Sequence, residues 1–368
     1  MTGPVTLVIA GGGTGGHLYP GIAVARELLR RVPDARVSFA GTARGLEARV
    51  VPKEGFELDV IRSAGLKGNS IAARAQGAAP VPVGLMDAWR LIARRRPHVV
   101  MGVGGYSSGP VVLAAALRRI PTMVLEQNAV PGLTNRMLAP WVRAAAVTFE
   151  QALSYFRGRG FVSGNPVRQE FFETSGGEDR TWRSPAILVL GGSQGAHAIN
   201  IVFQAAAPLL FQRLPGLTLV HQTGERDLVN VREAYQRAGV QAQVAPFLDA
   251  VAAEMAAADI VVGRAGATTL AELAAAGRPA VLVPFPGATD DHQRKNADVL
   301  AAAGAAVMLD ERELTAERLA DVIASLMDDA ARRREMAAAI RIFARPNAAA
   351  VIVDRLLELA GAPERQAA

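Results

Sequence analysis

The sequence predicts an α/β protein with two doubly wound domains, each built on a parallel sheet. Three observations point to this fold class. Short apolar segments alternate with helix-forming segments, a glycine-rich loop follows the first apolar segment, and the same plan starts again near residue 186. A chain of 368 residues is long enough for two domains that each bury a core.

The first half opens with a continuous apolar run, Val5–Ala10, which predicts a strand buried on both faces. Glycine-rich residues 11–16 follow as a loop, and a helix is expected over Gly21–Arg31. The next strands are expected at Val37–Phe39, Val99–Val103 and Thr122–Leu125. Strands that alternate with helices in this way favour parallel pairing through crossover helices.

The second half repeats this plan with a strand at Ala186–Leu190, a glycine loop at Gly191–Gly195 and a helix at Ala196–Gln212. Later strands are expected at Thr218–Gln222, Gln243–Ala245, Ile260–Val262 and Ala280–Val283. The polar, glycine-containing stretch between Gly164 and Pro185 marks the domain boundary. We predict domains at 1–165 and 166–346, with a terminal helix over 347–362 that the sequence alone assigns to neither.

The amino-acid composition excludes some classes of function and favours others. The chain has no cysteine, which excludes a disulfide scaffold, a cysteine-ligated metal site and thiol catalysis. The formal net charge of +6 favours a polyanionic partner, either a nucleic acid, an anionic membrane or a phosphorylated substrate. No apolar run reaches the ~18–20 residues of a spanning helix, so we expect a soluble protein that can still bind a membrane surface.

Residues 11–16 contain the pattern G-x-G-x-x-G between a strand and a helix. Glycines let the backbone approach an anion, and a helix N-terminus offers N–H groups to a pyrophosphate. A dinucleotide cofactor is disfavoured because Phe39 is followed by Ala40, Gly41 and Thr42, where an acidic residue for the ribose is expected. The alternative is a tight turn without a ligand.

The second glycine loop, Gly191–Gly195, lacks the Gly-Lys-Ser/Thr ending of a P-loop. Two glycine loops at carboxyl strand ends predict one phosphate-bearing ligand between the domains, although both could be packing turns. Residues 264–269, followed by Glu272, suit a phosphate and a sugar diol, or alternatively a helix cap with a solvated first-turn acid.

Two further polar groups follow predicted strands. The segment Asp290–Asn296 contains no Asp-x-Asp and no second histidine at ligand spacing, so we predict no metal and no cofactor. Gln293 in this segment is a candidate for sugar hydroxyls, against a solvated loop and helix cap. Glu126, Gln127 and Asn128 end a strand at the rim where ligands bind in such sheets.

The segment Ala72–Arg96 mixes Trp89 and aliphatic residues with several arginines. Such a mixture suits an interfacial membrane patch. It equally suits an amphipathic core helix whose terminal cations favour the helix dipole.

Together, seven motifs in order resemble the bacterial MurG-type glycosyltransferases: Gly11–His17, Gly104–Pro110, Glu126–Asn135, Gly164–Arg168, Gly191–Ala196, Arg264–Glu272 and Asp291–Asn296. That family moves N-acetylglucosamine from UDP-N-acetylglucosamine to lipid I, the lipid-linked muramyl-pentapeptide precursor of peptidoglycan, and forms lipid II. The resemblance covers almost the whole chain. It implies a glycosyltransferase-B fold of two Rossmann-like domains, with the helix over 347–362 packing back on the first.

The resemblance also implies roles for individual residues. His17 is the first candidate for the general base and Glu126 the second. The expected donor-binding residues are Thr14, Gly15, Gly16, Asn128, Arg168, Ser193, Leu248, Ala267, Thr268, Thr269, Glu272 and Gln293. The expected acceptor-binding residues are Gly13, Tyr106, Gln127 and Asn135.

The implied partners are UDP-N-acetylglucosamine, lipid I, the anionic cytoplasmic face of the cell membrane and proteins of a cell-wall or division complex. No nucleic-acid partner is expected. The protein is therefore expected at that face as a peripheral protein. Three alternatives remain. They are a UDP-sugar transferase of the same fold with a different lipid acceptor, a UDP-sugar epimerase, and a non-catalytic UDP-binding scaffold.

Overall fold

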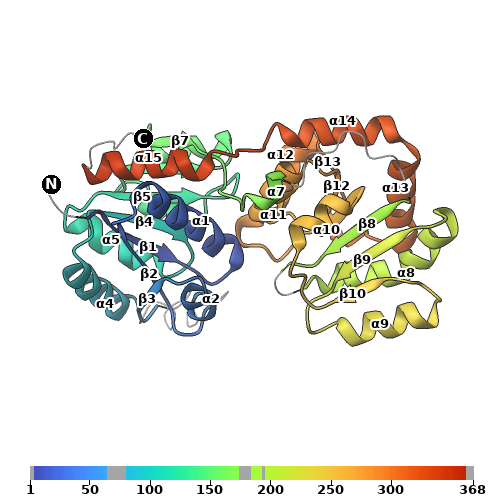
Figure 1. Cartoon of the computed structure of the whole chain (residues 1–368), viewed down its shortest axis with the longest axis horizontal. Helices are drawn as coiled ribbons and strands as arrows, with labels where there is room; N and C mark the ends of the chain where they lie inside the picture. Colours follow the sequence, from blue (N-terminus) through green and yellow to red (C-terminus); the bar gives the residue numbers. More distant parts are fainter. Residues whose placement is uncertain (1–3, 64–79, 174–183, 193–194, 362–368) are drawn as a thin grey trace. The chain divides into compact units, whose positions relative to one another are not determined.

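The computed structural model describes residues 4–63, 80–173, 184–192 and 195–361 (Figure 1). The chain divides into two compact units. Unit 1 is Met1–Val167 with Asn347–Ala368, and unit 2 is Arg168–Pro346. The boundary predicted from the sequence, between residues 165 and 166, lies close to this division.

Unit 1 contains a seven-stranded sheet in the order β3-β2-β1-β4-β5-β6-β7, with every neighbouring pair parallel. Its strands are β1 (Thr6–Gly11), β2 (Arg36–Gly41), β3 (Glu57–Val60), β4 (Val99–Gly104), β5 (Thr122–Glu126), β6 (Ala144–Val147) and β7 (Gly160–Val162). Its helices are α1 (Gly15–Arg31), α2 (Glu47–Lys53), α4 (Pro80–Arg95), α5 (Ser108–Leu117), α6 (Leu133–Leu138), the 3-10 helix η1 (Glu150–Phe156) and α15 (Ala348–Ala360).

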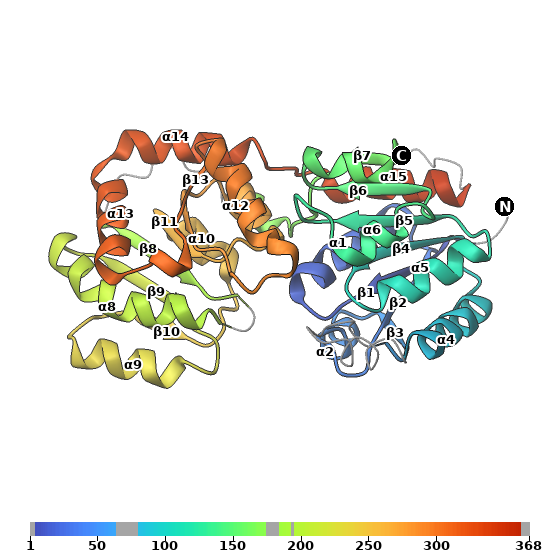
Figure 2. The same ribbon diagram turned by 180° about the vertical axis from the view of Figure 1, so that it is seen from behind.

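Helices cover both faces of this sheet because side chains of a strand alternate between its two sides. Leu7 and Ile9 of β1 pack in a core shared with α1 and α15, whereas Val8 and Ala10 pack with α4 and α5. Seen from behind, α5 and α6 come to the foreground (Figure 2).

The C-terminal helix α15 belongs to unit 1 although it follows unit 2 in the chain. Its apolar face, with Ile352, Val353 and Leu356, is buried in the same core as β1 and α1. Arg31 of α1 pairs with Asp354 at 2.6 Å. The helix therefore ties the end of the chain to the first helix of unit 1.

Unit 2 contains a six-stranded parallel sheet in the order β10-β9-β8-β11-β12-β13. Its strands are β8 (Ala186–Leu190), β9 (Thr218–Gln222), β10 (Gln243–Ala245), β11 (Ile260–Gly263), β12 (Ala280–Leu282) and β13 (Ala306–Met308). Its helices are α7 (Glu170–Glu173), α8 (His197–Arg213), α9 (Leu228–Arg237), α10 (Val251–Ala257), α11 (Ala267–Ala276), α12 (His292–Ala302), α13 (Ala316–Asp328) and α14 (Ala330–Arg341), with 3-10 turns η2 (Thr289–Asp291) and η3 (Glu311–Glu313).

These two parallel α/β units confirm the predicted fold class. Two details differ from the prediction. Helix α1 begins at Gly15 rather than near Gly21. Its first turns are rich in residues of poor helix propensity, so the sequence pattern predicts a later start. Packing against the rest of the unit overrides this low propensity. Strands β3, β6, β7 and β13 were not predicted; each has three or four residues, too few to show a periodic pattern.

Within the described ranges, no helix is long and apolar enough to cross a membrane.

Candidate functional site

The site in unit 1 begins where β1 and β4 end. A Cβ on Gly11 would lie 2.6 Å from the carbonyl oxygen of Gly104, and a Cβ on Gly105 would lie 2.4 Å from that of Gly12. Non-bonded atoms do not approach so closely, so the two loops pack backbone against backbone. Only glycine allows this approach.

His17 lies on this pair of loops, in the first turn of α1. A Cβ on Gly104 would come within 2.9 Å of its imidazole Cδ2, so the ring packs directly over that glycine. Its Nδ1 lies 3.4 Å from Oγ1 of Thr14, and the residue is partly exposed. Gly13 and Thr14 are exposed, and Gly15 and Gly16 open the helix.

Glu47, which the sequence reasoning missed, lies beneath the first glycine loop. Its side chain is almost fully buried and accepts hydrogen bonds from the Gly13 N–H at 2.8 Å, the Thr42 N–H at 2.9 Å and the Thr42 hydroxyl at 2.8 Å. Burial alone would raise the pKa of Glu47, but these hydrogen bonds outweigh it and hold the pKa below its usual range. The carboxylate is therefore charged at neutral pH.

Glu126, the last residue of β5, organises the loop that follows it. It is 1% exposed. One carboxylate oxygen accepts from the N–H and the side-chain amide of Asn128, at 2.9 and 3.1 Å. The other accepts from the Gly132 N–H at 3.1 Å and the Asn135 amide at 2.9 Å. Burial raises the pKa of Glu126, although these hydrogen bonds act to lower it.

The four expected acceptor-binding residues divide into two groups. Gly13 and Tyr106 are exposed. Gln127 and Asn135 are buried: the Gln127 amide donates to the Val103 carbonyl at 2.9 Å, and Asn135 donates to the Leu125 carbonyl at 3.1 Å as well as to Glu126. These two side chains tie the end of β5 to its neighbouring segments.

In unit 2, the glycine loop after β8 is held from the side by Gln222, a second residue missed from the sequence. Its side-chain amide donates to the carbonyls of Gly192 at 3.0 Å and Pro246 at 2.8 Å. A Cβ on Gly195 would lie 2.2 Å from the Thr223 carbonyl, which makes glycine necessary there. Ser193, the expected phosphate-contacting residue of this loop, lies outside the described residues.

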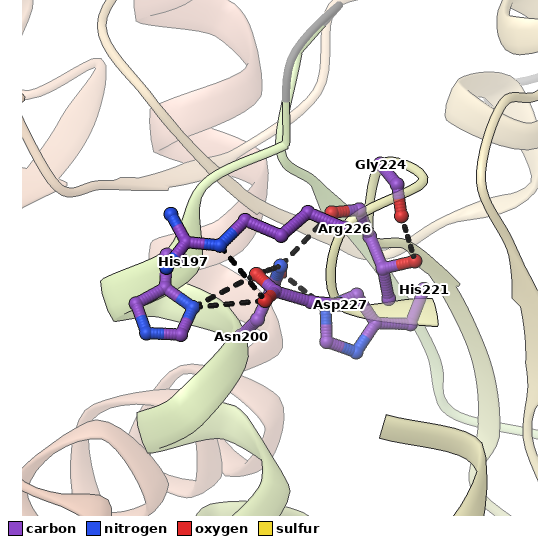
Figure 3. Close-up of polar contacts among 7 residues, drawn as sticks. His197, Asn200, His221, Gly224, Arg226 and Asp227 are labelled. Atoms are coloured by element: carbon purple, nitrogen blue, oxygen red, sulfur yellow. Dashed lines mark hydrogen bonds and ion pairs between the residues drawn. The ribbon is translucent and has the colours of Figure 1, made fainter. Parts of the chain in front are cut away.

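A polar network anchors the start of α8 beside this loop (Figure 3). The buried Asp227 lies 2.9 Å from Nδ1 of His197 and accepts from the Asn200 amide at 2.8 Å. Burial acts to raise the pKa of Asp227, but these two partners hold it below the usual value. Asn200 also accepts from the buried His221, whose other ring nitrogen lies 2.8 Å from the Tyr235 hydroxyl.

The acceptor oxygen of Asn200 defines the protonation state of His221. Because that oxygen can only accept, Nε2 of His221 carries the proton and Nδ1 accepts from Tyr235. Burial lowers the pKa of His221 to about 3, which keeps the ring neutral. The network therefore fixes the orientation of Asn200 and, through Asp227, that of His197.

The loop after β11 leads into α11, whose first turn contains Ala267, Thr268 and Thr269. Arg264 supports this loop: its guanidinium donates to the Val283 carbonyl at 3.1 Å and stacks over the Phe285 ring at 5.2 Å. The N–H groups at the start of a helix are suited to an anion.

Glu272 follows one turn later in α11. Burial raises its pKa to about 7, with the charge of Arg168 lowering it and that of Glu170 raising it. Arg168 pairs with Glu170 at 2.9 Å and lies over the Phe171 ring at 5.1 Å. The expected Arg168 and Glu272 thus interact electrostatically within unit 2.

The remaining expected donor residues occupy neighbouring loops of unit 2. Leu248 is partly buried after β10. The side-chain oxygen of Gln293, near the start of α12, accepts from the Phe285 N–H at 3.0 Å and so joins α12 to the loop after β12. Within the described part of the chain, no cluster of three or more histidine or acidic residues is arranged to hold a metal ion.

Comparisons with known proteins identify the family. Residues 7–147 match the glycosyltransferase family 28 N-terminal domain, and residues 186–352 match the family 28 C-terminal domain. Proteins named UDP-N-acetylglucosamine–N-acetylmuramyl-(pentapeptide) pyrophosphoryl-undecaprenol N-acetylglucosamine transferase are similar along nearly the whole chain. One from Anaeromyxobacter sp. (strain K) is 48% identical, covering 96% of this chain and 92% of the relative. One from Pelobacter propionicus is 46% identical, covering 95% and 98%.

Solved structures agree. The crystal structure of Acinetobacter baumannii MurG matches with a TM-score of 0.78 and 31% identity, covering 96% of this chain and all of that one. A UDP-GlcNAc 2-epimerase from Neisseria meningitidis matches with a TM-score of 0.68 at 14% identity, which reports a shared fold only. The chain therefore belongs to the MurG family of glycosyltransferases, within glycosyltransferase family 28.

Proposed function

We propose that this protein is an inverting glycosyltransferase that moves N-acetylglucosamine from UDP-N-acetylglucosamine to the C4 hydroxyl of the muramyl sugar of lipid I. The product is lipid II, the precursor of peptidoglycan. The observation that carries the proposal is the similarity to relatives named for this reaction, at 45–48% identity over about 96% of the chain.

Unit 2 supplies the groups that bind the UDP part of the donor in this proposal. Thr268 and Thr269 at the start of α11 would receive the diphosphate together with the helix N–H groups, and Glu272 would accept hydrogen bonds from the ribose hydroxyls. Arg168 carries a positive charge close to Glu272 and would stabilise the negative charge that develops on departing UDP.

Unit 1 supplies the base. The acceptor hydroxyl loses its proton as its oxygen attacks the anomeric carbon. The bond from that carbon to UDP breaks in the same step, so the α-linked donor gives a β-1,4 bond with inversion. His17 is suited to this step because it is partly exposed and an imidazole titrates near neutral pH. Glu126 is less suited, because four hydrogen-bond donors occupy its two buried oxygens.

The membrane-facing surface is proposed to lie on α4, α5 and α6 of unit 1, three helices that contact one another in that order. Large apolar side chains are exposed on these helices, namely Met86, Trp89, Leu117, Leu133 and Met137, and Trp141 is exposed just after α6. Arg118 stacks over Trp89 at 5.0 Å, so cations accompany the apolar groups. This combination favours an anionic lipid surface.

Helix α4 also has a core face, with Ala88, Leu91 and Ile92 buried. The core interpretation of this segment therefore fits the buried face of α4, and the membrane interpretation is proposed for its exposed face. Residues 72–79 of the predicted patch lie outside the described residues. We also propose that the protein acts at the cytoplasmic face of the cell membrane, where contacts with cell-wall or division proteins are expected.

The function is tested by incubating the protein with labelled UDP-N-acetylglucosamine and a short-chain lipid I analogue, with a chelator present. The expected result is a labelled lipid product. UDP binding without transfer would instead favour a scaffold. Conversion of the labelled UDP-sugar into its epimer, without transfer, would favour an epimerase.

Replacing His17 with alanine removes the proposed base. We expect kcat to fall about 10²–10⁴-fold, the usual contribution of a general base, with UDP affinity within about twofold of wild type. Steady-state transfer kinetics and calorimetry measure the two quantities. Tyr19→Phe, two residues further along α1, is the matched control and should leave both unchanged. Near-normal turnover of His17→Ala would remove His17 from this role.

Glu272→Gln tests the ribose contact through its pH dependence. Since the pKa of Glu272 is about 7, its carboxylate is largely ionised at pH 8 and largely protonated at pH 6. A protonated carboxyl accepts hydrogen bonds from the ribose hydroxyls less well than a carboxylate does, so the affinity for UDP should fall severalfold from pH 8 to pH 6. The variant should bind about tenfold more weakly at pH 8 and show a flatter profile. Glu313→Gln, on the surface of unit 2, is the control, and parallel profiles for wild type and Glu272→Gln would contradict the assignment.

Membrane binding is tested by flotation with vesicles containing anionic phospholipid. We expect binding at low salt that weakens at about 0.5 M salt, because screening shortens the range of the arginine charges. Trp141→Ser should reduce binding, whereas Ile342→Ser, on the exposed surface of unit 2, should not. Equal flotation of all three proteins, or binding that does not respond to salt, would count against the proposed surface.

A further inference from the structure

The first glycine loop is built around a carboxylate of the protein itself. A Cβ placed on Gly12, Gly41 or Gly45 would come within 2.1–2.5 Å of side-chain atoms of Glu47. Gly12 after β1, and Gly41 and Gly45 at the end of β2 and in the segment that follows it, thus leave the space that this side chain fills. Around it, two backbone N–H groups and one hydroxyl donate to its two oxygens.

This arrangement gives the glycine loop a different role from that of a dinucleotide-binding loop. In a dinucleotide-binding loop the backbone N–H groups are directed at a pyrophosphate. Here the Gly13 N–H is directed at Glu47, which supplies an anion from within the fold. The acidic residue that is absent directly after β2 is replaced by one at the start of α2, and that residue binds the loop instead of a ribose.

The loop that Glu47 holds leads directly to His17. Gly13 is followed by Thr14, whose carbonyl accepts from the N–H groups of His17 at 3.3 Å and Leu18 at 3.2 Å. The Thr14 hydroxyl lies 3.4 Å from Nδ1 of the His17 ring. The position of the ring therefore depends on Thr14, and the position of Thr14 depends on the hydrogen bond between Gly13 and Glu47.

We propose that Glu47 is a positioning residue for the transfer reaction: its buried carboxylate holds the loop Gly11–Thr14 in the conformation that places His17 for proton removal. The inference rests on the proposed function. Glu47 itself touches no reacting atom in this account. The charge matters because amide donors bind a carboxylate more strongly than a neutral acceptor.

Glu47→Gln is the sharpest test. The glutamine amide would present N–H donors where N–H and O–H donors already converge, so the loop must shift although the side-chain volume is conserved. We expect kcat to fall at least tenfold while UDP affinity stays within twofold, because Thr268, Thr269 and Glu272, the groups proposed to bind UDP itself, lie in unit 2. Glu54→Gln, whose carboxylate pairs with Arg26 at the surface just beyond α2, is the matched control and should match wild type in both measurements.

A milder pair of variants keeps the test decisive if Glu47→Gln does not fold. Thr42→Val removes one donor to Glu47 and keeps the shape, whereas Thr42→Ser retains the hydroxyl. We expect kcat to fall severalfold in Thr42→Val and to stay within twofold of wild type in Thr42→Ser, with unchanged UDP affinity in both. Equal turnover of these two variants would overturn the inference.

Hydrogen exchange of residues 11–18 separates this inference from the proposed function. Loop positioning predicts faster exchange of these amides in Glu47→Gln than in Glu54→Gln. A folded Glu47→Gln protein with wild-type turnover and wild-type exchange would overturn the assignment. If the wild-type protein transfers no sugar, the proposed function fails, and exchange at residues 11–18 still decides whether Glu47 holds the loop.

Discussion

Close backbone contact between the loops that follow β1 and β4 is the constraint on which unit 1 depends. The two strands pair in parallel, and their register shifts between Ala10 and Gly11 just before the loops meet. Because no Cβ fits at Gly11 or Gly105, the loops approach more closely than other residues allow. This contact provides the surface on which the His17 ring packs.

Both units hold their loops with buried polar groups. In unit 1, the carboxylates of Glu47 and Glu126 accept hydrogen bonds from backbone N–H groups in the segments that follow β1, β2 and β5. In unit 2, neutral amides have this role, since Gln222 holds the glycine loop and Asn200 links Asp227 to His221. Such networks specify one loop conformation because an unpaired buried group is costly. His17, the proposed base, follows directly after one of the loops fixed in this way, at the start of α1.

The parallel sheets and the ligand loops could be predicted because they depend on patterns that are local in the sequence. Apolar runs such as Ala186–Leu190 mark buried strands, and glycine clusters mark the loops that follow them. Glu47 could not be predicted, because an acid at the start of a short helix has the same local pattern whether it is solvated or buried. Its burial depends on Gly12 and Gly13 of the loop after β1, which is far from Glu47 in the sequence and meets it only in the folded sheet. Likewise, Gln127 and Asn135 have the sequence pattern of ligand-binding groups, yet their hydrogen bonds are made within the protein.

In the proposed reaction, the muramyl hydroxyl displaces UDP directly, with a base from unit 1 and UDP bound by unit 2. The most direct measurement is the anomeric configuration of the disaccharide formed from α-linked UDP-N-acetylglucosamine, read from the proton coupling of the new linkage by NMR. A single displacement predicts a β-1,4 product. An α-linked product would contradict direct displacement, and free N-acetylglucosamine without any disaccharide would contradict transfer to this acceptor.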